Sequence, residues 1–85
     1  MTIQLEKNFN TFRVRLNKKS YNSSYIMIFK NKFLKKETIY DIVDITPNEV
    51  YSTFTLDIEI DKGEYVYIIK ESDDVLNKIG IAYIN

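Results

Sequence analysis

The 85-residue sequence contains no cysteine and no histidine. Without cysteine there is no disulfide framework, no iron–sulfur or zinc–thiolate site and no thiol nucleophile. Without histidine the commonest general base, the Ser-His-Asp triad and most transition-metal sites are excluded as well. We therefore expect a protein that is not an enzyme, with no catalytic residue, no cofactor and no metal.

Glycine is scarce, and so are long apolar runs. The two glycines, Gly63 and Gly80, are far apart, which excludes a glycine-rich phosphate loop. No apolar run is long enough to span a bilayer, and Glu6 stands where a signal peptide needs an apolar core. We therefore expect a chain made in the cytoplasm, with no membrane partner.

What the chain has is Ile, Tyr, Phe and Val, which favour strands over helices. Short apolar or alternating stretches recur at roughly ten-residue spacing, which predicts one all-β domain over residues 1–85, a β-sandwich of about seven antiparallel strands. Polar residues at Asn8–Asn10 and Asn17–Ser24 predict turns or loops, and Ser72-Asp73-Asp74 predicts a hairpin loop with its tip at Asp73–Asp74. The expected strands are Thr2–Glu6, Thr11–Leu16, Tyr25–Phe29, Thr38–Ile45, Val50–Ile60, 64–71 and a last strand formed by Val75-Leu76 and Ile79–Ile84. Alternation along three of them turns apolar residues inward: Ile3 and Leu5; Phe12, Val14 and Leu16; and Phe54, Leu56, Ile58 and Ile60.

The most informative stretch is 61–69. Gly63 precedes an aromatic and β-branched run and predicts a positive φ at a turn. Both faces of the following strand are apolar, which predicts a central strand covered on both sides. The Asp-x-Gly-x-Tyr spacing resembles the tyrosine corner of immunoglobulin-like sandwiches, with Tyr65 at the corner and Tyr67 at the place of the second cysteine. Gly80, inside the last strand, predicts a β-bulge or a close backbone approach.

Two other stretches offer candidate chemistry. Thr46–Glu49 has the form of a capping box and predicts at most a single helical turn. Asp57, Glu59 and Asp61 share one face of the expected strand Val50–Ile60, where Thr53 also lies. Three carboxylates suggest a cation site or a glycosidase pair, but a regular strand face of this pattern is ordinarily solvated, and we expect the solvated face.

Charge is unevenly distributed along a chain of zero net charge. Residues 1–36 hold nine Lys and Arg and one acid, and residues 37–85 hold three lysines and eleven acids. Aromatic residues are interleaved with the basic ones from Arg13 to Lys36, as in single-strand nucleic-acid grooves. Because the net charge is zero and those aromatics also fit inward-facing positions, we do not expect nucleic acid as a partner. The pair Lys35-Lys36 suits an exposed edge that resists strand pairing with other chains.

From Tyr25 onward the sequence resembles small immunoglobulin-like virion proteins of tailed bacteriophages that infect Bacteroidota (the crAss-like group). Four segments carry the resemblance: Asp44-Ile45-Thr46, Tyr51-x-x-Phe54-x-Leu56, Gly63-Glu64-Tyr65-Val66-Tyr67-Ile68-Ile69 and Leu76-x-x-x-Gly80-Ile81. The resemblance implies an Ig-like β-sandwich and a structural virion protein, with no active residue to carry over.

On that resemblance we expect an auxiliary (decoration) capsid protein of the virion that binds the major capsid protein and stabilises the head. Other virion proteins and copies of the chain itself are further expected partners. One alternative is a neck or tail adaptor or a fibre-associated module. Another is a carbohydrate- or cell-binding module, which needs a patch of exposed aromatics; Tyr21, Tyr40 and Tyr51 are the candidates.

Overall fold

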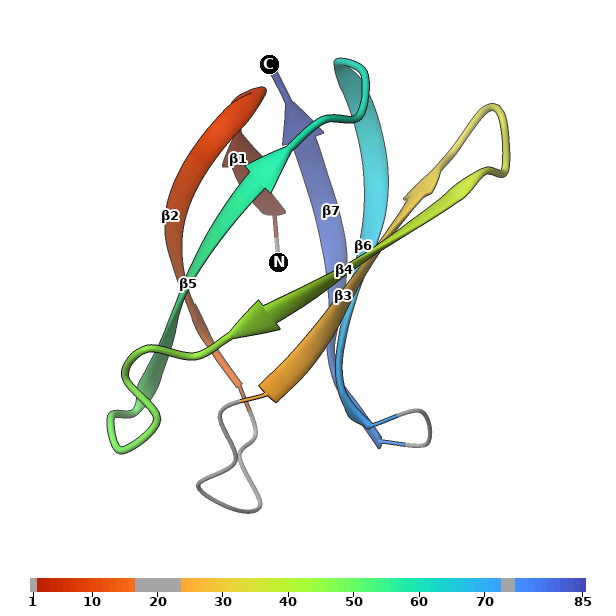
Figure 1. The fold of residues 1–85 in the computed structure, drawn as a ribbon. Coiled ribbons are helices and arrows are strands. Elements are labelled where there is room, and N and C mark those ends of the chain that lie inside the picture. Colours follow the sequence, from red (N-terminus) through yellow and green to blue (C-terminus); the bar gives the residue numbers. More distant parts are fainter. Residues whose placement is uncertain (1, 17–23, 73–74) are drawn as a thin grey trace.

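The computed structural model describes residues 2–16, 24–72 and 75–85, and these form seven strands and no helix (Figure 1). The prediction of an all-β fold with about seven strands is confirmed. The strands are β1 (Thr2–Leu5), β2 (Asn8–Arg15), β3 (Ser24–Asn31), β4 (Glu37–Val43), β5 (Tyr51–Ile58), β6 (Gly63–Ser72) and β7 (Val75–Ile84).

The strands form two sheets. One has five strands in the order β1-β7-β6-β3-β4, and the other consists of β2 and β5, which stand apart from β6 and β7 in Figure 1. All neighbours pair antiparallel except β1, which runs parallel to β7. The expectation of purely antiparallel strands is therefore wrong at this edge. Because β1 and β7 come from opposite ends of the chain, no tight turn fixes their relative direction.

The core lies between the sheets and is built by side-chain alternation along the strands. Ile3 and Leu5 on β1 and Val14 on β2, which the sequence pattern turned inward, are buried, whereas Phe12 is only partly buried. The Phe54 ring of β5 bridges the sheets, with centroids 5.7 Å from Phe12 and 5.6 Å from Tyr25. Aromatic pairs at such separations add to the stability that area burial alone provides.

Residues Asn8–Asn10, predicted as a turn, instead begin strand β2. Asn8 has a φ of 83°, a left-handed conformation that asparagine tolerates better than most residues. The side chain of Asn10 accepts a hydrogen bond from the Glu6 amide (2.8 Å) and donates one to the Glu6 carbonyl (2.6 Å). The chain therefore bends before Asn8, and β2 starts at Asn8 and not at Thr11, where the alternation predicted its start.

The segment between β4 and β5 contains a turn and no helix. The Glu49 amide donates to the Thr46 carbonyl at 3.1 Å, so the capping-box sequence forms a tight turn. The strand expected over Val50–Ile60 is shorter, Tyr51–Ile58, and its inward residues Phe54, Leu56 and Ile58 are buried as predicted.

Strand β6 lies between β7 and β3, so it is central to the larger sheet as predicted. Tyr65, Tyr67 and Ile69 on one face are buried. Val66 and Ile68 on the other face are only half-buried, and the expectation that both faces are covered is wrong. In the described part of the chain the second layer consists of two strands, which cover one face of the sheet.

Two expectations fall outside the described residues: the loop around Tyr21 and the hairpin tip at Asp73–Asp74. In the described ranges no helix is long and apolar enough to cross a membrane.

Candidate functional site

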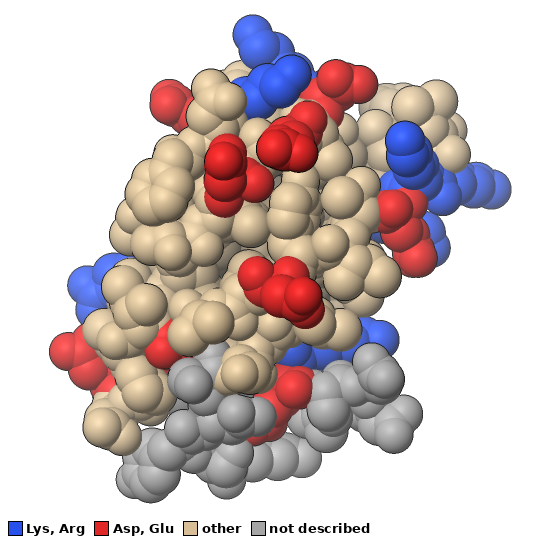
Figure 2. Space-filling model, viewed as in Figure 1, with Lys and Arg blue, Asp and Glu red and all other residues tan. Residues whose placement is uncertain are grey.

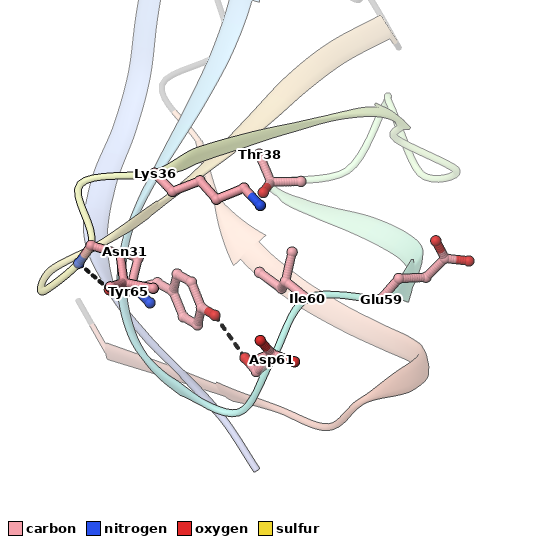
Figure 3. A pocket seen from close by; sticks show the side chains of 8 residues that line it. Asn31, Lys36, Thr38, Glu59, Ile60, Asp61 and Tyr65 are labelled. Atoms are coloured by element: carbon pink, nitrogen blue, oxygen red, sulfur yellow. Dashed lines mark hydrogen bonds between the residues drawn. The ribbon is translucent and has the colours of Figure 1, made fainter.

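The predicted corner tyrosine ties β6 to the connection that precedes it. The Tyr65 hydroxyl donates a 2.7 Å hydrogen bond to the Asp61 carbonyl (Figure 3). The Tyr65 ring packs edge-on against Phe29, with 6.1 Å between the ring centroids. Gly63, between the two bonded residues, has a φ of +151°, a conformation that side chains with a Cβ rarely adopt. Tyr65 and Gly63 therefore shape the β5–β6 connection, and their roles are structural.

Tyr67 is fully buried, and its hydroxyl has no hydrogen-bond partner among the described residues. Burial raises the pKa of this phenol above its ordinary value, so the group remains neutral. Gly80 pairs directly with Tyr67, and Ala82 pairs with Tyr65. Paired residues share a face of the sheet, so the two large rings lie opposite the two smallest side chains on β7.

Of the two alternatives predicted at Gly80, a β-bulge or a close backbone approach, the bulge is wrong. Pairing is regular around this glycine, and the irregularities lie further along, between Ile69 and Lys70 and between Lys70 and Ser72. A glycine inside a strand signals either a distortion or a need for space, and here it lies across from a large aromatic residue.

A buried polar cluster joins the end of β4 to β5. Asp44 is almost fully buried, and its Oδ1 accepts hydrogen bonds from the amides of Thr46 (2.9 Å) and Thr53 (3.1 Å). The Thr46 hydroxyl lies 3.1 Å from the Tyr51 carbonyl and 3.0 Å from the Thr53 hydroxyl. Thr53 is only 9% exposed, so its predicted solvent-facing position is wrong. The segment Asp44-Ile45-Thr46 thus connects the end of β4 to β5 through hydrogen bonds.

One cavity of about 250 Å³ opens between the β3–β4 hairpin and the β5–β6 connection (Figure 3). In Figure 3 the Lys36 and Thr38 side chains lie on one side, Tyr65 and Asp61 on the other, and the Glu59 carboxylate points away. No nucleophile–base pair is present among the residues that line it. These are Asn31, Leu34, Lys36, Thr38, Glu59, Ile60, Asp61 and Tyr65.

Asp57, Glu59 and Asp61 are exposed to solvent, as predicted. The shared strand face is wrong, because β5 ends at Ile58 and only Asp57 lies within it. Glu59 and Asp61 both belong to the cavity wall, whereas Asp57 does not. Within residues 2–16, 24–72 and 75–85 no group of three or more acidic, histidine or cysteine side chains is placed to hold a metal ion.

The outer face of the five-stranded sheet, turned away from β2 and β5, is apolar over four strands. Ile39, Ile28, Ile68 and Ile79 are successive partners across β4, β3, β6 and β7, and we call them the isoleucine row. The end members are 61% (Ile39) and 54% (Ile79) exposed, and the two central ones are half-buried. Isolated exposed isoleucines are ordinary, but a contiguous apolar row is typical of an interaction surface.

Beside the isoleucine row the outer face carries a polar cluster. Lys32 Nζ lies 2.9 Å from Glu64 Oε2, and Glu64 pairs across the strands with Tyr83. Hydrogen bonds from Lys32 and then Tyr83 lower the pKa of the Glu64 carboxyl, and the same Glu64 contact raises the pKa of the Tyr83 phenol. This cluster is an ordinary rim for an apolar patch.

The tip of the β3–β4 hairpin exposes two further apolar residues. Phe33 is 84% exposed and Leu34 is 75% exposed. Asn31 was the signal in the sequence for a turn at this place, because an asparagine side chain at the start of a turn accepts hydrogen bonds from the amides two and three residues later.

The aromatics considered for carbohydrate binding do not share one role. The Tyr40 ring packs edge-on against Phe29 at 5.8 Å, and its hydroxyl accepts a bond from the Glu59 amide. Tyr51 lies under the Arg13 guanidinium at 5.4 Å, and Tyr21 is outside the described residues. Tyr40 is thus engaged in internal packing.

Comparison with known proteins gives no match: no protein-family model, no curated protein and no solved structure is significantly similar to the chain.

Proposed function

We propose that this protein is a non-enzymatic structural protein of a phage virion, an auxiliary capsid protein that binds the major capsid protein. The phage assignment rests on the sequence resemblance from Tyr25 onward. The docking part of the proposal is carried by one observation, the isoleucine row on the uncovered face of the five-stranded sheet.

We also infer that the sandwich is Ig-like. In an Ig-like arrangement the strands C, F and G form one sheet and B and E belong to the other. Taking β3, β6 and β7 as C, F and G, and β2 and β5 as B and E, reproduces these neighbours, and β4 extends the larger sheet. The Tyr65–Asp61 bond has the form of a tyrosine corner and supports the same reading. The two-stranded second sheet is a departure from the common pattern.

Docking through the isoleucine row removes apolar surface from water on both partners, at roughly 25 cal/mol per Å². A partner that binds only the folded form also raises the apparent stability of a small domain. For a chain of 85 residues, whose core alone supplies modest stability, attachment to a shell is thus a source of stability as well as of location.

Mass spectrometry of purified particles tests this proposal. We expect the protein in the particle at a copy number comparable to that of the major capsid protein. A copy number comparable to that of portal or tail proteins would move the proposal to a neck or tail adaptor. Absence of the protein from purified particles would overturn the proposal.

A further inference from the structure

The β3–β4 turn carries the two most exposed large apolar side chains of the described residues, Phe33 and Leu34. Both lie at the end of a hairpin that projects from the body of the molecule (Figure 1). Keeping an exposed phenylalanine and leucine adjacent at a loop tip contributes nothing to the core, since neither belongs to it.

The tip is held in one conformation by its own hydrogen bonds. Asn31 Oδ1 accepts from the amides of Phe33 (2.8 Å) and Leu34 (2.9 Å). The Asn31 carbonyl accepts from the Lys35 amide (3.0 Å), and the Asn31 amide donates to the Lys36 carbonyl (2.9 Å). Lys35 completes the turn with a φ of 53°. A turn fixed in this way loses little conformational freedom when it binds, which favours affinity.

The two apolar side chains are surrounded by lysines. Figure 2 shows basic side chains gathered at the projecting tip. Lys32 is paired with Glu64, whereas neither Lys35 nor Lys36 has an ion-pair partner in the described part of the chain. The tip therefore presents two apolar side chains next to positively charged lysines. The partner surface that matches it is an apolar pocket with an acidic rim.

We propose that the Phe33–Leu34 tip is an anchor that inserts into an apolar pocket with an acidic rim on the surface of a partner protein. The partner's identity rests on the proposed function, under which it is the capsid shell. The pocket receives the phenylalanine and leucine side chains, and the Lys35 side chain lies against the acidic rim, whereas Lys36 lines the cavity behind the turn.

A protein pocket fits this tip better than an anionic lipid surface. Leu34 and Lys36 share a cavity with Glu59 and Asp61, which belong to the β5–β6 connection. Figure 2 shows acidic side chains gathered over the end of β5 and that connection. A flat anionic surface that meets the tip also approaches these carboxylates, and repulsion between them opposes binding within a Debye length. A pocket that admits only the turn avoids this contact.

The test uses shells assembled without this protein, to which purified protein is added and bound protein is measured by sedimentation. The double variant Phe33→Ser/Leu34→Ser should bind at least about 30-fold more weakly than the natural protein, as expected for a buried aromatic anchor. The matched control is Phe9→Ser, which removes another exposed phenylalanine, on β2, and should bind as the natural protein does.

The charge contact is tested by Lys35→Glu, which should weaken binding by about tenfold and reduce its dependence on salt. Lys7→Glu, at an exposed position outside the hairpin, is the charge control. All variants should keep the unfolding midpoint of the natural protein because the changed side chains are exposed.

The outcomes separate the two proposals. If the natural protein does not bind shells, the proposed function and the anchor fail together. If it binds and the tip variants bind equally well, the anchor alone is wrong. If it binds vesicles with anionic lipids and the tip variants do not, the tip is a lipid-binding element and the protein pocket is wrong.

Discussion

The two faces of strand β6 have similar apolar sequences and different environments. Tyr65, Tyr67 and Ile69 face the second sheet and are almost completely buried, whereas Val66 and Ile68 face outward and are half-buried. The difference arises because β2 and β5 provide a layer on one side of the larger sheet only. Apolar side chains on a strand thus indicate only that the surface is unfavourable in water. The position of the second sheet determines which face the chain itself covers and which face is left for a partner.

The largest contrast should come from truncating neighbouring isoleucines on opposite faces. Ile69→Ala should lower the free energy of unfolding by about 2–5 kcal/mol, because it leaves a cavity in the core. Ile68→Ala, one residue earlier on the outer face, should cost about 1 kcal/mol. Urea unfolding followed by circular dichroism measures both values.

If Ile69→Ala does not fold, the gentler pair Ile69→Val and Ile68→Val keeps the comparison measurable. A single buried methylene typically contributes about 0.5–1.5 kcal/mol, so Ile69→Val should still lower the free energy of unfolding more than Ile68→Val does. Equal losses at the two positions would mean that the outer face is covered within the monomer.

A second contrast lies within the inner face. Tyr65→Phe removes a hydroxyl that bonds the Asp61 carbonyl and should lower the free energy of unfolding by about 1 kcal/mol. Tyr67→Phe removes a buried hydroxyl without a partner among the described residues, so its stability should be unchanged or slightly higher. Thermal or urea unfolding of the two variants makes the comparison, and a reversed order would contradict the assignment of Tyr65 as the corner.

Sequence reasoning reached the strands and most inward residues because alternation is a local signal. Tyr65 was also accessible, since the glycine before it and its spacing from Asp61 are local. The parallel β1–β7 pair, the burial of Thr53 and the open outer face were not accessible. Each depends on which distant segments meet: Thr53, for example, donates its amide to Asp44, which follows β4 and is nine residues away in the sequence.

The candidate surfaces were predictable only in composition. The apolar residues of β3, β6 and β7 are evident in the sequence, but their alignment into the isoleucine row requires the register of three strand pairs. The sequence likewise contains Phe33 and Leu34, but their exposure depends on the bonds that Asn31 makes within the turn. The predicted bulge at Gly80 failed for a related reason, because the register places Tyr67 opposite it.

Alkaline pH should have a smaller effect, which involves the buried tyrosines of the inner face. Burial raises the folded-state pKa of Tyr67, and that of Tyr25 with added repulsion from Glu71 and Asp44, above the ordinary value of 10.0. A raised folded pKa gives stability that is fully present below the unfolded pKa and is lost as pH rises through the folded pKa. The free energy of unfolding should therefore fall above about pH 10.

The control for that titration is Tyr67→Phe, which retains every lysine and every other tyrosine. Its free energy of unfolding should fall less steeply above about pH 10 than that of the natural protein, because one of the groups that ionise on unfolding is absent. Parallel curves for the two proteins would show that Tyr67 ionises equally in the folded and unfolded states.

The smallest effect on stability is expected at the exposed ends of the isoleucine row. Ile39→Thr/Ile79→Thr keeps β-branched side chains at positions that are more than half exposed, so the free energy of unfolding should change by no more than about 0.5 kcal/mol per substitution. Under the proposed function the same variant should bind shells about tenfold more weakly, since it removes apolar contact area. Val50→Thr, another exposed β-branched position outside the row, should change neither property. If Ile39→Thr/Ile79→Thr binds shells as the natural protein does, no partner covers the outer face, whereas the second sheet covers the inner face.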